Sequence, residues 1–142
     1  MKFDAKNLKI NSLILIILTF LSAIAMIGQI MANELSIGKI MELANTNEQI
    51  AFISFMIVIS LSGLIYLITI FVGIRGMQQA NGKVKGKSHI VLAMILLALN
   101  MLSLAVCIFF AIKGQFDIMN ILQNVIYISF LVHYILCAKN VG

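Results

Sequence analysis

The chain has 142 residues, of which 62% are hydrophobic and 11% are charged, and its mean hydropathy is +1.09. A water-soluble domain of this composition would have to bury nearly every side chain, so these values exclude an ordinary soluble protein and indicate a membrane protein. The formal charge of +5 comes mostly from lysines that flank the apolar stretches. We therefore do not interpret it as a nucleic-acid-binding surface, and expect no nucleic-acid partner.

Four apolar stretches are long enough to cross a bilayer, which takes roughly 20 residues for about 30 Å of hydrocarbon. They occupy residues 10–31, 50–74, 90–112 and 118–138. The remaining chain is too short for a separate soluble domain. We therefore expect one all-α membrane domain over residues 1–142, a polytopic four-transmembrane-helix bundle.

The first stretch follows three lysines, as the apolar core of a secretory signal peptide would. Its length is well beyond the roughly 7 to 15 apolar residues of such peptides. We expect it to be retained as a span.

The connection after the first span contains apolar residues at helical spacing, namely Ile37, Ile40, Met41 and Ala44. This pattern predicts a short amphipathic helix within residues 34–46. Such a helix would lie in the outer interface or cap the bundle, and a continuation of the first helix beyond the bilayer fits the pattern equally well.

The Lys and Arg residues between the spans lie mostly on one side. Eight belong to the N-terminus, the second connection and the C-terminus, against two in the other connections. By the positive-inside rule, both termini and the second connection should be cytoplasmic. The basic residues of that connection could simply set this orientation, or contact anionic lipid headgroups or a partner, at roughly 1 kcal/mol each for a lipid contact; they are Arg75, Lys83, Lys85 and Lys87.

Small and polar residues form a stripe on each span, which marks the faces that helices use to pack in lipid. On the second span, Gly73 shares the stripe, which continues to Gly76 and Ala80 if the helix extends. Inward-facing stripes give a compact bundle whose outer half is the more polar. The binding or pore-lining candidates are Gln29, Asn100, Gln123, Asn124 and Tyr127.

These candidates have two interpretations. The first is that their amides bond across helices and hold the bundle together, at about 0.6 kcal/mol per bond. The second is that they line a water-filled vestibule that admits a polar ligand from outside.

The sequence lacks the residues that several kinds of chemistry require. No Asp, Glu, Lys or Arg lies in the middle of a span, whereas coupled carriers usually need one. In size the chain is similar to the small multidrug-resistance family, but that family relies on a glutamate in its first span, which residues 10–31 lack. His89 is expected at the membrane edge as a headgroup contact, away from His133, and we expect no cofactor, no metal site and no catalytic residue.

The sequence therefore predicts a small non-catalytic integral membrane protein. We expect an accessory, assembly or immunity-type subunit that binds another membrane component through helix faces. The alternative is a small oligomeric channel or uniporter with a polar outer vestibule. Expected partners are the lipid bilayer with possible anionic lipid at the inner face, and a membrane protein or further copies of the chain. In size and pattern the chain resembles small four-span proteins of bacterial plasma membranes, which implies that location.

Overall fold

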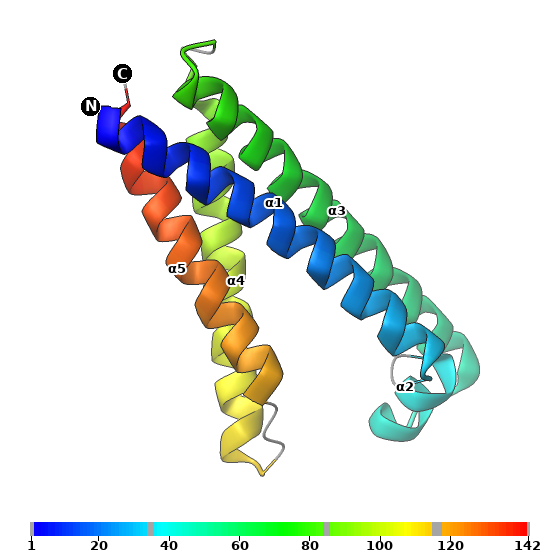
Figure 1. Cartoon of the computed structure of the whole chain (residues 1–142). Coiled ribbons are helices and arrows are strands. Elements are labelled where there is room, and N and C mark those ends of the chain that lie inside the picture. Colours follow the sequence, from blue (N-terminus) through cyan, green and yellow to red (C-terminus); the bar gives the residue numbers. More distant parts are fainter. Residues whose placement is uncertain (1, 34–35, 84–85, 115–117, 142) are drawn as a thin grey trace. The chain divides into compact units, whose positions relative to one another are not determined.

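The computed structural model describes residues 2–33, 36–83, 86–114 and 118–141, without the side chains of residues 2, 3 and 43. Within these ranges the chain forms helices and connecting turns only (Figure 1). The helices are α1 (Lys2–Met31), α2 (Ile37–Ala44), α3 (Glu48–Ala80), α4 (Ser88–Ile112) and α5 (Ile118–Asn140).

Four of these helices, α1, α3, α4 and α5, are long and apolar enough to cross a membrane. The all-helical architecture with four potential spans is thus confirmed, and four such helices suggest an integral membrane protein. Helix α1 begins eight residues before the predicted span and α3 continues six residues past it, because the flanking polar residues are good helix formers and the chain contains no proline.

The end of α3 is set by a glycine. Gly82 has a φ of 73°, in the left-handed region that glycine adopts at little cost. Its N–H bonds to the carbonyl of Gln79, and the N–H of Lys83 bonds to that of Gln78. This is a Schellman motif, which uses up carbonyls that the last turn of a helix would otherwise leave unpaired.

The amphipathic segment forms its own helix, α2, instead of continuing α1. Asn33, with a φ of 58°, follows the end of α1. The side chain of Ser36 then caps α2 by accepting a hydrogen bond from the N–H of Lys39 at 3.2 Å. At the other end, the C-cap residue Asn45 adopts the left-handed conformation. Both ends of this short helix are therefore capped.

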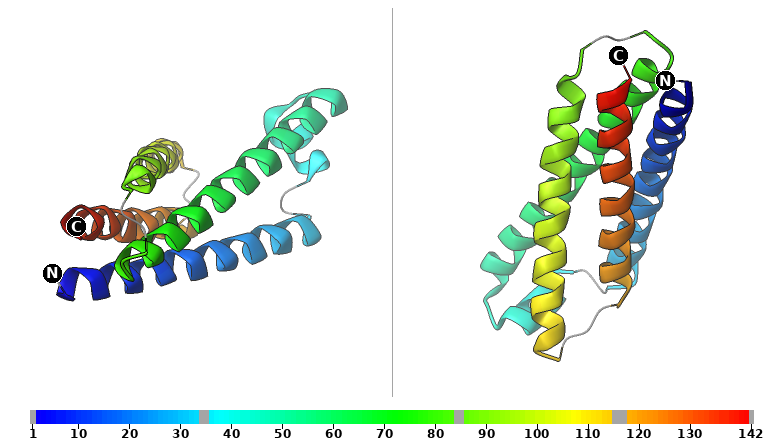
Figure 2. Two further views of the ribbon diagram at one scale, coloured as in Figure 1. Left: turned by 90° about the horizontal axis from the view of Figure 1, so that it is seen from above. Right: turned by 90° about the vertical axis from the view of Figure 1, so that its left-hand side faces the viewer.

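The chain divides into two compact units, which we describe separately. Unit 1 comprises residues 1–16 and 69–142, and unit 2 comprises residues 17–68. Unit 1 therefore contains the start of α1, the end of α3 and the whole of α4 and α5. We call the end of unit 1 where α1 begins and α5 finishes the terminal end (Figures 1 and 2). We call the opposite end, where α4 connects to α5, the hairpin end.

Helices α4 and α5 run antiparallel, side by side (Figure 2). Their mutual seam is visible in the burial pattern, since the half-buried and buried positions alternate at spacings of three and four residues, as in left-handed helix pairs. On α4 these positions are 90, 93, 97, 100, 104, 107 and 111, and on α5 they are 121, 124, 128, 131, 135 and 138.

The fully buried positions of these two helices gather toward the terminal end. On α4 they run from His89 to Leu96. On α5 they run from Tyr127 to Ala138. Among the described residues of both helices nearer the hairpin end, none is buried. Within unit 1, it is thus the terminal half of this helix pair that also packs against α1 and α3.

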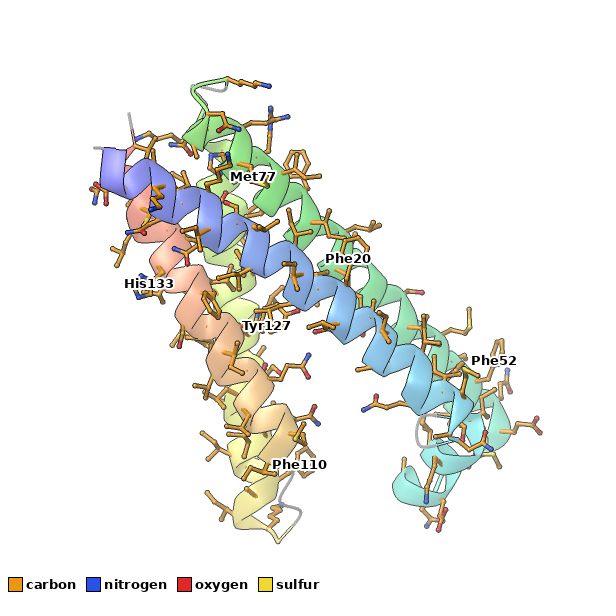
Figure 3. The ribbon with its side chains drawn as sticks, viewed as in Figure 1. Phe20, Phe52, Met77, Phe110, Tyr127 and His133 are labelled. Atoms are coloured by element: carbon orange, nitrogen blue, oxygen red, sulfur yellow. The ribbon has the colours of Figure 1, made fainter. Side chains whose placement is uncertain are left out.

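Unit 2 contains α2 with the adjoining parts of α1 and α3. The hydroxyl of Tyr66 on α3 lies 4.0 Å from the sulfur of Met26 on α1. Phe20 and Phe52, labelled in Figure 3, are both at least half exposed. A shallow groove follows one face of α3 between residues 52 and 61 and is apolar apart from Ser60. These surfaces suit contact with lipid.

Candidate functional site

Two of the polar candidates, Asn100 and Asn124, lie along the α4–α5 seam. The amide nitrogen of Asn124 approaches the sulfur of Cys107 at 3.8 Å and donates to the carbonyl of Asn120 on its own helix at 3.0 Å. The amide of Asn100 donates to the carbonyl of Leu96, also on its own helix, at 2.9 Å. Tyr127 is buried. The seam thus brings Asn124 to Cys107 across two helices, whereas the bond of Asn100 is local.

The two glutamine candidates lie on the surface. Gln123 on α5 is exposed, one residue before the half-buried Asn124. Gln29 on α1 is also exposed and belongs to unit 2. The five candidates are therefore distributed over seam and surface, and four of them belong to unit 1.

The basic candidates occupy the terminal end of unit 1. Arg75 donates to the side-chain oxygen of Gln78 at 3.3 Å and lies 5.7 Å from the ring centre of Phe71. Lys87 donates to the backbone carbonyl of Lys139 at 3.1 Å. Its positive charge interacts favourably with the helix dipole at the C-terminus of α5. Lys83 is exposed. The fourth residue of this set, Lys85, lies outside the described residues.

A buried polar cluster at the terminal end joins three helices. The hydroxyl of Tyr134 on α5 lies 2.6 Å from Nδ1 of His89 on α4 and donates to the carbonyl of Val72 on α3 at 2.8 Å. The His89 and Tyr134 rings meet edge to face, with centres 5.8 Å apart. His89 is only 1% exposed and Tyr134 is fully buried. We call this group, together with Gly76 and Gln79, the terminal cluster.

Gly76 makes room for the tyrosine. A Cβ atom at this position would collide with the Tyr134 ring and with the hydroxyl oxygen of Ser12 on α1. The hydroxyl of Ser12 is itself turned back onto the carbonyl of Leu8 at 2.7 Å. At Gly73, three residues earlier, an added Cβ would lie 2.6 Å from a side-chain carbon of Ile16. The small-residue face of α3 therefore packs directly against α1 and α5.

Gln79 connects the end of α3 to the end of α5. Its amide nitrogen donates to the carbonyls of Ala138 at 2.9 Å and Val141 at 2.8 Å. Ala138 lies in the last turn of α5, where backbone acceptors lack helical partners, and Val141 directly follows the helix. Gln79 is 3% exposed, so this side chain acts as a buried cap for a neighbouring helix.

A second contact near this end involves a thiol. The amide nitrogen of Asn11 on α1 lies 4.0 Å from the sulfur of Cys137 on α5. Cys137 is buried and Cys107 half-buried, and both thiols are free. Each cysteine thus packs within the helices and receives a contact from an amide nitrogen.

The terminal cluster corrects the expectation that His89 contacts lipid headgroups. His89 is buried with its ring against Tyr134, whose hydroxyl in turn bonds to Val72 on α3. The signal in the sequence was the small-residue stripe of α3 continuing through Gly76, combined with Tyr134 on the polar stripe of α5. The exposed histidine is His133, which lies on α5 one residue before Tyr134 (Figure 3).

In the part of the chain that the structure describes, no group of three or more His, Cys, Asp or Glu residues could hold a metal ion. The terminal cluster pairs a histidine with a phenol, and the residues it contacts are backbone carbonyls and small side chains. This arrangement can order helices and hold a proton or a hydrogen bond in place.

No family model, curated protein or solved structure matches the chain. The surfaces and polar groups of the molecule are therefore the observations that bear on its function.

Proposed function

We propose that the protein is a non-catalytic accessory, assembly or immunity-type subunit that binds another membrane protein through helix faces. The observation that supports this proposal best is the contrast along the α4–α5 pair. Its terminal half buries side chains against α1 and α3, whereas the described residues of its hairpin half include none that is buried.

The hairpin half also exposes polar side chains within apolar helices. Ser103 on α4 and Asn120 and Gln123 on α5 all lie on this surface. Small and polar residues of this kind are enriched where transmembrane helices meet each other. Their exposure on this surface therefore supports contact with a helix of a partner protein.

We propose further that the terminal end is cytoplasmic, in a bacterial plasma membrane. Unit 1 carries most of its described cations at this end, and one described acidic residue, Asp4, accompanies them. The exposed cations are Lys6, Lys9, Lys83, Lys87 and Lys139. A basic end of this kind is retained inside by the positive-inside rule and attracts anionic headgroups.

Photo-crosslinking in the native membrane tests the partner surface. A photoreactive residue would replace Leu102 or Leu122, which are 63% and 49% exposed in the hairpin half. The matched control is Leu136, which is 56% exposed in the terminal half of α5. We expect both hairpin-half positions to capture the same, unlike protein and Leu136 to capture none. Lipid adducts alone at all three positions would contradict the proposal.

The alternative, a small oligomeric channel or uniporter, draws support from the half-buried polar residues of the seam. Cys107 lies among them, beside Asn124, and provides a native probe. In a Cys137→Ala background, a membrane-impermeant maleimide would label Cys107 if the seam lined water. Protection of Cys107, together with no crosslink between copies at Leu102 or Leu122, would remove this alternative.

A further inference from the structure

The terminal cluster contains two buried side-chain atoms without a hydrogen-bond partner, Nε2 of His89 and Oε1 of Gln79. The two side chains are 1% and 3% exposed. A buried polar atom that makes no hydrogen bond costs about 1–3 kcal/mol. This cost would be avoided if a small molecule occupied a site beside them.

The hydrogen bonds of the cluster fix the role of the histidine. The carbonyl of Val72 can only accept, so the single hydroxyl proton of Tyr134 goes to it. The contact of 2.6 Å between Tyr134 and His89 must then have Nδ1 of His89 as the donor. In a neutral imidazole this leaves Nε2 as a bare acceptor, directed away from the tyrosine.

The orientation of the glutamine is fixed in the same way. Both partners of its amide group are backbone carbonyls, those of Ala138 and Val141. Only the NH₂ end of the amide can serve them, so a flipped amide is excluded. Oε1 of Gln79 is therefore the second buried acceptor.

Both acceptors belong to the terminal end of unit 1. Gln79 is the second-to-last residue of α3, and His89 is the second residue of α4, which starts from the same end. Both side chains contact α5, His89 at Tyr134 and Gln79 at Ala138 and Val141.

We propose that the terminal end of unit 1 holds a buried water-binding site between α3, α4 and α5, with His89 Nε2 and Gln79 Oε1 as its protein ligands. Water has two protons to donate, one for each acceptor, and polar sites with two or more partners are those that retain internal water. A cationic ligand is disfavoured because Arg75, Lys83, Lys87 and Lys139 surround this end. The site is independent of the partner surface at the hairpin end.

Nuclear magnetic resonance of the full chain in nanodiscs tests the site. His133→Gln leaves His89 as the one histidine, and ¹⁵N labelling of histidine then reports its tautomer. We expect the Nδ1-protonated form with a hydrogen-bonded Nε2, and magnetisation transfer from water to the adjacent ring proton on Cδ2. An Nε2-protonated ring, or no transfer from water in this variant, would overturn the proposal.

The glutamine ligand is tested in the same background. Gln79→Leu should abolish the transfer from water, because it removes one acceptor and makes the site apolar. Gln78→Leu is the control, since this neighbour bonds to Arg75 at the surface of the helix, and it should leave the transfer unchanged. Persistent transfer in a folded Gln79→Leu variant would overturn the shared site. If that variant does not fold, the measurement with Gln79 intact still decides whether water is bound.

Discussion

The two halves of the α4–α5 pair have similar compositions but use their polar residues differently. In the terminal half, where α1 and α3 also pack, Tyr134 bonds to two other helices. In the hairpin half, Asn100 bonds to its own helix and Gln123 is exposed. A polar side chain in an apolar helix thus becomes a link between helices where several helices surround it. Where unit 1 supplies one neighbouring helix, the amides of Asn100 and Asn124 bond to their own backbone, and Asn124 adds a longer contact of 3.8 Å to Cys107.

The largest expected effect comes from filling the space that Gly76 leaves. Gly76→Leu forces a side chain into the Tyr134 ring and Ser12, and overpacking of this kind costs about 1–3 kcal/mol or more. Titration with SDS, followed by circular dichroism, would show a markedly lower midpoint of unfolding. Gly63→Leu on the same helix is the control, because an added Cβ there meets no atom within 4 Å. Equal effects at both positions would contradict the close packing of α3.

A leucine pair on α5 tests the contrast between the halves. Leu131, in the terminal half, is 1% exposed, and Leu122 lies in the exposed hairpin half. Leu131→Ala should destabilise by about 2 kcal/mol, the low end for a buried leucine, since lipid replaces water around the unfolded helices. Leu122→Ala should leave the SDS midpoint of the isolated protein nearly unchanged. If Leu122→Ala lowered the SDS midpoint more than Leu131→Ala, the buried part of the α4–α5 pair would lie at the hairpin end and the contrast would be contradicted.

Removing the hydroxyl of Tyr134 from the terminal cluster should cause an intermediate loss of stability. Tyr134→Phe keeps the ring but leaves Nδ1 of His89 without its partner, at a cost of about 1–3 kcal/mol. Combined with His89→Phe, the losses should be less than additive, because both changes remove the same bond. Ser129→Ala, which removes an exposed bond to the carbonyl of Val125, serves as the control. Strict additivity would show that the two rings do not interact.

The smallest effect is expected at Asn100. Its amide bonds to the carbonyl of Leu96, four residues earlier on α4, so Asn100→Leu removes no link between helices. We expect a change in stability within about 0.5 kcal/mol in either direction. A loss comparable to that of Tyr134→Phe would mean that the amide of Asn100 bonds to another helix.

Much of the fold could be predicted because membrane spans are set by length and hydropathy. The four long helices follow from uninterrupted apolar stretches, and the close packing of Gly73 follows from the small-residue stripe. The starts and ends of the helices were less predictable. Residues 2–9 and 75–80 are polar enough to lie outside the hydrocarbon but still favour helix. Low hydropathy therefore marks where an apolar stretch ends, but it does not tell where the helix ends.

The terminal cluster could not be predicted from individual residues. The ring of Tyr134 fits beside α3 because Gly76 has no side chain, and His89 is buried against that ring. Each condition depends on the register between helices that are distant in sequence. A stripe of polar residues gives the face of one helix but leaves its vertical alignment with the others open.

The unequal lengths of the helices have a consequence for the surrounding bilayer. Helix α3 has 33 residues and α5 has 23, which correspond to about 50 Å and 35 Å along their axes. A hydrocarbon layer of about 30 Å matches α5 closely, whereas α3 must tilt strongly or project from the surface. Because residues 75–80 are polar, we expect α3 to project from the hydrocarbon at this end, so that its last two turns would stand among the lipid headgroups as a raised contact point for molecules at the membrane surface.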